Sequence, residues 1–290
     1  MLNPDKEHRV ALVTHSSAGV GRALRVTDQV SALLTGKDIF HEIFKDEWPA
    51  HFGGFTMVWI VGGDGTMHQF VNRYPDIQLP IGLLKGGTGN DFHWLLYGET
   101  TIALQVELML QAAPITIDLG TCNDRYFING IGIGFEGAVA RDLTGKRKRP
   151  GKTSFLMAVL RKILDYRCAE FDIRYNGRRE TGRFLLVDLS NGSRAGGGFH
   201  VAPVARPDDG YLDLITAGPL SPLQRLRYLP VIERGKHLHL PFVRHERLQS
   251  ISIESTSILQ YHCDGEYAEA SRLEIGILPG RLRFLCDPLS

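Results

Sequence analysis

The fold is decided by the stretch Trp59-Ile60-Val61-Gly62-Gly63-Asp64-Gly65-Thr66, an apolar run that leads directly into three glycines, an aspartate and a threonine. A helical pattern over residues 67–74 follows at once. A buried strand that ends in glycines can leave backbone amides open to an anionic ligand. The stretch therefore predicts a phosphate-binding loop. An ordinary Asp-Gly turn stays open as the alternative for this motif alone.

A second loop of the same kind lies about one βα unit further along the chain. Residues 79–84 read as a strand, and Lys85-Gly86-Gly87-Thr88-Gly89-Asn90-Asp91 follows it. The carboxyl ends of parallel strands meet at one edge of a sheet, where α/β proteins bind their ligands. We therefore expect the two glycine-rich loops to be neighbours at that edge.

The first part of the chain alternates strand and helix patterns. Strands are predicted at 8–14, 38–44, 55–61 and 79–84, and helices at 22–34, 67–74 and 101–111. This order predicts an open, mostly parallel α/β sheet. The loop at 16–21, which contains Gly19, is a weaker candidate phosphate contact at a helix N-terminus, with a plain tight turn as the alternative.

The second part of the chain has a different pattern. Strands are predicted at 126–133, 171–175, 183–190, 211–216, 248–254, 257–262, 272–277 and 281–285, with helices only at 154–165 and 222–233. His237-x-His239 alternates with leucines and reads as one face of a strand. We expect a largely antiparallel β domain at 115–290 after an α/β domain at 1–114, with the C-terminal tail able to pack back on the first domain.

Composition narrows the function classes. The net charge of +1 gives no global sign of nucleic-acid binding. Four widely spaced cysteines without a CxxC pair fit reduced thiols in the cytoplasm. No apolar run approaches the ~20 residues of a membrane span, so we expect membrane contact to be peripheral and transient. The basic run at 146–152 would attract anionic lipids, or is a solvated loop.

Three groups of carboxylates are candidates for chemistry. Asp64, Asp91 and Asp118 follow or begin elements at the expected ligand edge, and Mg²⁺ commonly joins carboxylates to phosphate oxygens. Asp208-Asp209 lies in a Pro/Gly turn and is either a cation site or a solvated turn. Asp264-Gly265-Glu266 is either a general base with its partner or a β-turn.

Taken together, these motifs resemble the diacylglycerol kinase catalytic-domain family, and in particular its small bacterial soluble lipid kinases, which are similar to sphingosine kinases. The resemblance rests on the following stretches: Gly62–Thr66, Gly87–Phe92, Ile117–Gly120, Phe127–Gly134, Gly196–Leu212 and Asp264–Glu266. It implies an α/β N-terminal nucleotide domain, a C-terminal β-sandwich-like domain, and ATP between them. It also implies transfer of the γ-phosphoryl of ATP to a diacylglycerol-like lipid hydroxyl at the inner membrane surface.

The resemblance also implies site residues. ATP would be held by Gly19, Gly62, Gly63, Asp64, Gly65, Thr66, Thr88, Asn90 and Asp91. The catalytic Mg²⁺ would be supported by Asp64, Asp91 and Asp118, and a structural Mg²⁺ by Asp209 with the carbonyls of Arg206 and Tyr211. Asp264, with Glu266 as the alternative, would be the general base.

One departure from the family pattern affects the first loop. Where the family has an Asn-Pro pair, this chain has His15-Ser16, which bears on the adenine side of the site. GGDGT alone is shared with NAD kinases, so a kinase of a soluble acceptor such as NAD stays open, as does a non-catalytic nucleotide-binding regulator. The motifs carry no headgroup code for the lipid, and they leave a homodimer open.

Overall fold

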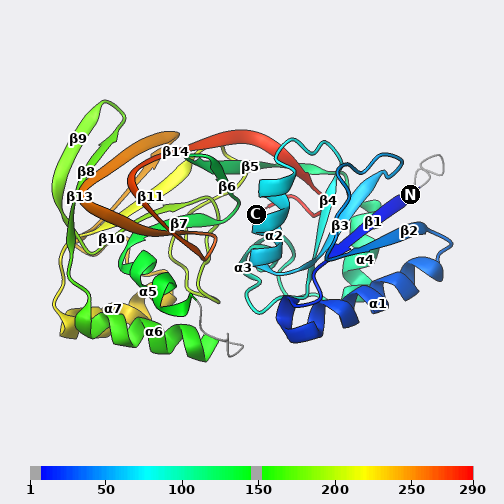
Figure 1. Cartoon of the computed structure of the whole chain (residues 1–290), viewed down its shortest axis with the longest axis horizontal. Helices are drawn as coiled ribbons and strands as arrows, with labels where there is room; N and C mark the ends of the chain where they lie inside the picture. The colour runs from blue at the N-terminus through cyan, green and yellow to red at the C-terminus, as the bar shows by residue number, and fades with distance from the viewer. Residues whose placement is uncertain (1–7, 145–151, 290) are drawn as a thin grey trace. The chain divides into compact units, whose positions relative to one another are not determined.

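The computed structural model describes residues 8–144 and 152–289, although the side chains of 152–155 are not described (Figure 1). The chain forms two compact units. Unit 1 is Met1–Ile117 with Gly280–Ser290, and unit 2 is Asp118–Pro279. The chain leaves unit 1 along β5 (Ile115–Cys122) and returns along β14 (Glu266–Phe284).

Unit 1 contains a parallel sheet. Its strands are β1 (Arg9–Thr14), β2 (Phe40–Lys45), β3 (Met57–Gly62) and β4 (Ile81–Lys85), in the order β4-β3-β1-β2 (Figure 1). All neighbours among them run parallel. Every residue of β3 is buried, which explains its uninterrupted apolar sequence. The predicted parallel α/β fold of the N-terminal part is confirmed.

Helices connect these strands. They are α1 (Arg22–Thr35), α2 (Asp64–Arg73), α3 (Asp91–Tyr97) and α4 (Ile102–Gln111), with a short 3₁₀ turn at Ala18–Gly21. Trp59 and Val61 of β3 share one apolar cluster with α1 and α4. The sequence did not predict α3, because only seven residues separate the glycine loop from Gly98.

The C-terminal tail completes the core of unit 1. Leu282, Phe284 and Leu285 are buried there. Phe284 pairs with Ile81 of β4, and its ring lies 5.6 Å from that of Phe92. The return of the tail follows from its own apolar residues, which need a partner surface.

Unit 2 is built on an antiparallel sheet. The path β12-β11-β10-β7-β13-β14 comprises β12 (Val243–Leu248), β11 (Leu212–Ala217), β10 (Leu186–Ser190), β7 (Gly130–Gly134), β13 (Ser250–Cys263) and β14. The hairpin of β8 (Ala169–Tyr175) and β9 (Arg178–Phe184) joins β13, and β6 (Arg125–Phe127) pairs with β5. One large apolar cluster fills this β-sandwich-like unit.

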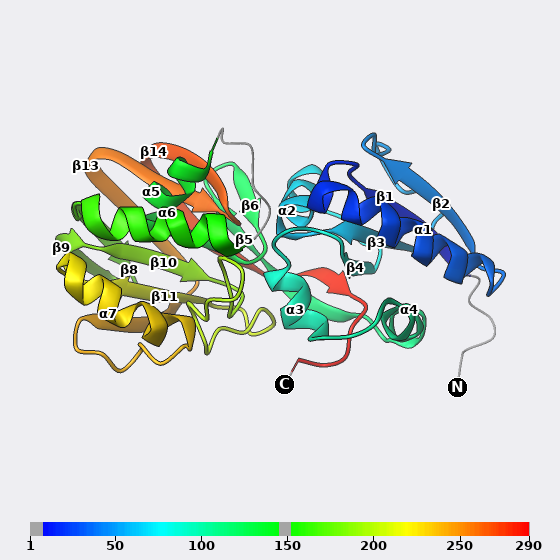
Figure 2. The same cartoon turned by 90° about the horizontal axis from the view of Figure 1, so that it is seen from below.

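Three helices accompany the sheet of unit 2. They are α5 (Phe135–Leu143), α6 (Lys152–Asp165) and α7 (Pro222–Glu233). Figure 2 shows α6 and α7 side by side in front of β10 and β11. The bounds of α7 match the prediction because Ser221 and Gln224 form a capping box and Pro222 opens the helix. The sequence did not predict α5.

The structure corrects six strand predictions. Residues 126–133 form two strands, β6 and β7, because Asp264 binds the backbone between them. Residues 183–190 divide between β9 and β10. The four segments predicted within 248–285 belong to two long strands, β13 and β14, and a register shift between Glu254 and Leu259 accounts for the apparent break in β13.

The prediction of a strand at His237-x-His239 was wrong. His237 is buried, and its Nε2 lies 2.9 Å from the carbonyl oxygen of Val201, within hydrogen-bonding distance. The segment is a turn, so alternation with leucine here reflects local packing. Within the described residues, no helix is long and apolar enough to cross a membrane.

Candidate functional site

In unit 1, the two predicted glycine loops pack backbone against backbone. The amides of Gly86 and Gly87 donate to the carbonyl oxygen of Gly62 at 2.7 and 2.9 Å. A Cβ at Gly63 would lie 2.2 Å from the carbonyl oxygen of Gly89. Glycine is therefore required at Gly63 by close approach, and the structure brings the two loops together at the carboxyl edge of β3 and β4.

The N-terminus of α2 faces this junction. The amide of Asp64 donates to the carbonyl oxygen of Gly89 at 3.1 Å, and that of Met67 donates to Gly63 at 3.0 Å. The remaining first-turn amides belong to Gly65 and Thr66. A helix start offers such donors and a positive dipole end to an anion. The first turn of α2 can therefore bind a phosphate group.

The carboxylate of Asp64 connects the loops to α3. Its Oδ2 accepts from the amide of Asp91 at 3.0 Å, and its Oδ1 accepts from the amide of Phe92 at 3.1 Å. These are charge-assisted bonds at a helix N-terminus, where a negative charge is favoured. Asp64 thus positions Asp91 directly, a connection that the sequence alone did not reveal.

Asn90 and Thr88 have different roles in the second loop. The amide side chain of Asn90 bonds both ways with the backbone of Gly87, at 3.1 and 3.0 Å, and so holds the loop closed. Thr88 is exposed at the loop tip. Of these two predicted nucleotide contacts, Thr88 is exposed and Asn90 is half-buried.

The first loop reaches the same place. Gly19 has φ of 58°, and a Cβ on it would lie 2.1 Å from the carbonyl oxygen of Gly86. Arg22 donates from Nη1 to the carbonyl oxygen of Gly87 at 3.2 Å. Sequence reasoning missed Arg22. The feature that could have indicated it is an arginine in the first turn of the helix that follows the Gly19–Gly21 loop.

His15 stands where the family pattern has its Asn-Pro pair. Its ring lies 4.6 Å from that of Trp48, and its Nδ1 lies 3.4 Å from Asp46. The amide of Ser16 donates to Asp46 at 2.7 Å and, as the main cause, lowers the pKa of that carboxyl. Asp46 therefore holds the altered first loop in place.

In unit 2, Asp264 binds the backbone that precedes β7. Its carboxylate accepts the amides of Ile128, Asn129 and Gly130 at 2.9, 2.8 and 3.0 Å. Glu266 is exposed at the start of β14. The predicted turn is present, with Asp264 at φ of 48°, and its two carboxylates have distinct surroundings.

Asp118 comes together with the 206–211 turn. Its amide donates to the carbonyl oxygen of Pro207 at 2.7 Å, and its Oδ2 accepts the amide of Gly210 at 2.7 Å. Asp209 accepts the amide of Tyr211 at 3.1 Å and pairs with the guanidinium of Arg247. A cationic side chain thus meets the carboxylate predicted to hold a structural Mg²⁺.

The same turn also contains an ion pair that the sequence did not anticipate. The guanidinium of Arg206 pairs with the carboxylate of Asp208 at 3.2 Å. The part of Arg206 that could bind the predicted structural Mg²⁺ is therefore its backbone carbonyl oxygen.

The carboxylate of Asp64 is compatible with binding a hydrated magnesium ion. In residues 8–144 and 152–289, no three His, Cys, Asp or Glu side chains gather as a metal-binding group. A carboxylate oxygen that accepts one amide keeps a second acceptor direction, and Mg²⁺ usually retains several waters. Asp64, through such waters, fits a role in holding the ion.

A buried acidic pair lies beside β7. Burial raises the pKa of Glu136 to about 7, and burial together with the nearby Glu136 carboxylate raises the pKa of Asp188. His262 lies 3.9 Å from Glu136, and burial lowers the pKa of its imidazole to about 4. A Cβ at Gly132 would collide with both side chains, so that glycine makes room for them. Sequence reasoning did not find this pair.

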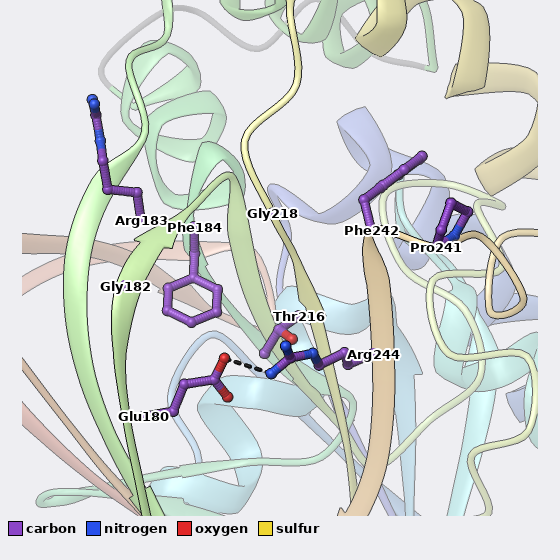
Figure 3. Close-up of a pocket in the computed structure, with 9 residues that line it drawn as sticks. All are labelled: Glu180, Gly182, Arg183, Phe184, Thr216, Gly218, Pro241, Phe242 and Arg244. Carbon is purple, nitrogen blue, oxygen red and sulfur yellow. Dashed lines mark hydrogen bonds and ion pairs between the residues drawn. The ribbon is translucent and has the colours of Figure 1, made fainter.

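A cavity of about 230 Å³ lies elsewhere in unit 2 (Figure 3). The ion pair of Glu180 with Arg244 and the ring of Phe184 border it. Its lining is Glu180, Gly182, Arg183, Phe184, Thr216, Gly218, Pro241, Phe242 and Arg244. These residues include none of the predicted site residues.

Two family models cover most of the chain. Residues 129–286 match the YegS C-terminal NAD kinase beta sandwich-like domain, and residues 9–122 match the diacylglycerol kinase catalytic domain. The chain belongs to the diacylglycerol kinase catalytic-domain family. The predicted family and fold class are confirmed, and so is the coarser prediction of a kinase family.

Relatives match over most of their own length. A diacylglycerol kinase of Staphylococcus carnosus (strain TM300) is 29% identical over 217 residues, 73% of this chain and 71% of that protein. A diacylglycerol kinase of Mycobacterium tuberculosis (strain ATCC 25618 / H37Rv) is 27% identical over 96% of this chain and 94% of that protein.

Solved structures show the same fold. A diacylglycerol kinase of Bacillus anthracis str. Sterne has a TM-score of 0.72 at 20% identity, covering 97% of each chain. Two further solved chains from that strain give TM-scores of 0.78 and 0.79 at 21% identity, each covering 97% of this chain and 98% of its own.

Proposed function

We propose that this protein is an ATP- and Mg²⁺-dependent kinase that transfers the γ-phosphoryl group to a hydroxyl of a diacylglycerol-like lipid, acting at the cytoplasmic face of a membrane. The observation that carries the proposal is the junction of three glycine loops against the first turn of α2. Membership of a lipid kinase family supports it, as do relatives named diacylglycerol kinase over nearly their full length.

The residues of unit 1 would bind the nucleotide. The amides of Gly65 and Thr66 would donate to phosphate oxygens, and exposed Thr88 would add a hydroxyl. Gly19, Gly62 and Gly63 would keep the backbone close enough for this. Phosphoryl transfer depends mainly on positioning and charge neutralisation, which such loops provide.

Carboxylates would hold the metal. Asp64 and Asp91 would accept from the waters of Mg²⁺, which when bound neutralises charge on the phosphates. Asp118 remains the proposed third carboxylate. For a structural cation, the carbonyls of Arg206 and Tyr211 are the proposed ligands with Asp209, in competition with the Arg247 pair.

The proton of the lipid hydroxyl would pass to Asp264 or Glu266. Asp264 is the preferred base because the three backbone amides hold and orient its carboxylate. Glu266, exposed two residues later, is the alternative.

A labelled-ATP screen tests this function. Diacylglycerol, ceramide, a sphingoid base, phosphatidylglycerol and NAD would each be offered with Mg²⁺. We expect label on one lipid and none on NAD, and we expect Asp64→Ala to abolish transfer. Label on NAD alone would assign a soluble-acceptor kinase. Nucleotide binding without transfer to any acceptor would assign a regulator, and normal turnover by Asp64→Ala would refute the proposed site.

A further inference from the structure

We propose that the outer surface of α6 and α7 docks on a bilayer that contains anionic lipid. The surface, here named the α6–α7 face, consists of the exposed side chains of Met157, Leu160, Leu164, Leu223 and Leu226. Docking would bring the protein to its lipid acceptor, so its role rests on the proposed function. The docking itself can be measured without turnover.

The two helices are fixed to each other. Arg225 of α7 donates from Nη1 to the carbonyl oxygens of Ile163 and Tyr166, at 3.2 and 2.9 Å. Leu229 packs on the cluster that contains Val159 and Ile163. Both views show α6 and α7 side by side (Figures 1 and 2). Their inner sides are therefore committed to packing, and their outer sides form one surface.

The apolar residues of the α6–α7 face follow helical spacing. In α6, Met157, Leu160 and Leu164 stand at i, i+3 and i+7, and they are 68%, 38% and 74% exposed. In α7, Leu223 and Leu226 stand at i and i+3, and they are 77% and 49% exposed. Large aliphatic side chains gathered at such exposure on two packed helices mark an interaction surface.

Positive charge surrounds these aliphatic residues. Arg161 and Arg227 occupy the i+4 position of each stripe and are exposed. Five exposed cationic side chains lie in residues 156–167 and 221–236, namely Arg161, Arg167, Arg227, Arg234 and Lys236, against the two carboxylates of Asp165 and Glu233. Lys162 lies 3.5 Å from Asp165 and 3.4 Å from Asp142, and Arg161, although 69% exposed, lies 3.9 Å from Asp142. The α6–α7 face is therefore apolar with a cationic margin.

This chemistry fits a lipid bilayer better than a protein partner. All five apolar residues are Leu or Met, which insert among acyl chains, while arginine stems reach up to the phosphate level. Protein interfaces are enriched in aromatic side chains as well as in Met and Arg, and none of the five exposed apolar residues of this face is aromatic. Each arginine near an anionic surface strengthens binding about fivefold, so the charge complementarity selects anionic lipid.

Vesicle co-sedimentation of the full chain without ATP tests the proposal. The vesicles would be phosphatidylcholine alone or phosphatidylcholine with phosphatidylglycerol. We expect salt-sensitive binding to the anionic vesicles. Leu164→Glu with Leu223→Glu should weaken it at least about tenfold. Arg161→Gln with Arg227→Gln should reduce binding to the phosphatidylglycerol vesicles by about 25-fold and change binding to phosphatidylcholine alone little.

A matched control separates docking from general surface effects. Leu104 of α4 is 65% exposed in unit 1, so Leu104→Glu should leave vesicle binding unchanged. Thermal unfolding confirms that each variant folds. Equal binding by the double leucine variant would overturn the proposal. So would a wild-type dimer that this variant dissociates while vesicle binding persists, because a second copy would then cover the face.

Failure of docking and failure of the proposed function give different results. Vesicle binding with no phosphoryl transfer to any acceptor would keep the docking surface and reject the kinase. Transfer to a detergent-dispersed lipid, with no vesicle binding, would keep the kinase and reject the docking surface.

Discussion

At the residue scale, two carboxylates that belong to the proposed site also accept hydrogen bonds from backbone amides. Asp64 and Asp264 each accept amides of a loop that the motifs also assign to the site. One side chain therefore contributes to both stability and the proposed chemistry. Variants at these positions need a stability measurement beside any assay.

The Asp264 and Glu266 pair can be resolved in this way. Asp264→Asn replaces one acceptor oxygen and leaves an amide among residues 128–130 unpaired, at a cost of about 1–3 kcal/mol. Glu266→Gln at an exposed position should change the free energy of unfolding by less than about 0.5 kcal/mol. With Asp264 as base, folded Asp264→Asn should lose turnover by about 10²–10⁴-fold.

Urea unfolding and labelled-ATP turnover at low temperature would measure both quantities. If Glu266→Gln loses that turnover while folded Asp264→Asn keeps it, the base is Glu266.

Glu136 predicts a pH effect on stability. Its pKa is about 7 in the fold against 4.5 otherwise, so the folded chain binds a proton that the unfolded chain releases. Its contribution to stability is therefore fully present below pH 4.5 and lost as the pH rises through about 7. Glu136→Gln should raise the free energy of unfolding at pH 8 by about 1–3 kcal/mol and change it little near pH 4.

Chemical denaturation of Glu136→Gln at both pH values would check this. An equal change in the free energy of unfolding at pH 4 and pH 8 would show that folding does not raise the pKa of Glu136.

At the element scale, the site depends on how closely two loops approach. The β3–α2 and β4–α3 loops meet through backbone atoms, so side chains contribute less there than the absence of a Cβ. The same close approach places the loops beside the first turn of α2, whose backbone amides can donate to an anion. Elements that are locally ordinary become a site through this contact.

Gly63→Ala tests that contact. The new methyl would meet the carbonyl oxygen of Gly89 at 2.2 Å, which overpacks the junction and should cost about 1–3 kcal/mol. Nucleotide binding, measured by calorimetry, should fall with it. Gly36→Ala is the matched control, because its Cβ would make an ordinary 3.4 Å contact at a helical φ of −63°. Equal nucleotide affinity in both variants would contradict the expected role of the junction.

At the scale of the whole molecule, each unit is assembled from distant parts of the chain. Residues 1–117 and 280–290 form unit 1, and the intervening chain forms unit 2. The tail fills the unit 1 core with Leu282, Phe284 and Leu285. Stability of unit 1 therefore depends on residues that lie more than 160 positions along the chain from its other elements.

Truncation after Pro279 should unfold unit 1. Each buried aliphatic or aromatic side chain removed costs about 2–5 kcal/mol, and together they approach the ~5–15 kcal/mol that stabilises a typical domain. Limited proteolysis with mass spectrometry should show cleavage within residues 9–111. Truncation after Asp287 keeps Phe284 and Leu285 and is the control. Resistance of residues 9–111 in the shorter chain would refute this dependence.

The sequence by itself determined the local features of this protein. Alternation of strands and helices, the glycine loops after β3 and β4, and the capped helix α7 are written in short patterns, so they could be predicted. Motif order also determined the family. Helix α5 and the short α3 lacked a strong enough periodic pattern, and they were missed.

Only the tertiary structure decided which distant residues meet. Asp264 binds an amide 136 positions away, Asp118 binds the amide of Gly210, and the tail returns to β4. It also decided which sides of α6 and α7 stay exposed. A sequence pattern reports its own neighbourhood, whereas such contacts follow from burying apolar surface and pairing backbone groups across the whole chain.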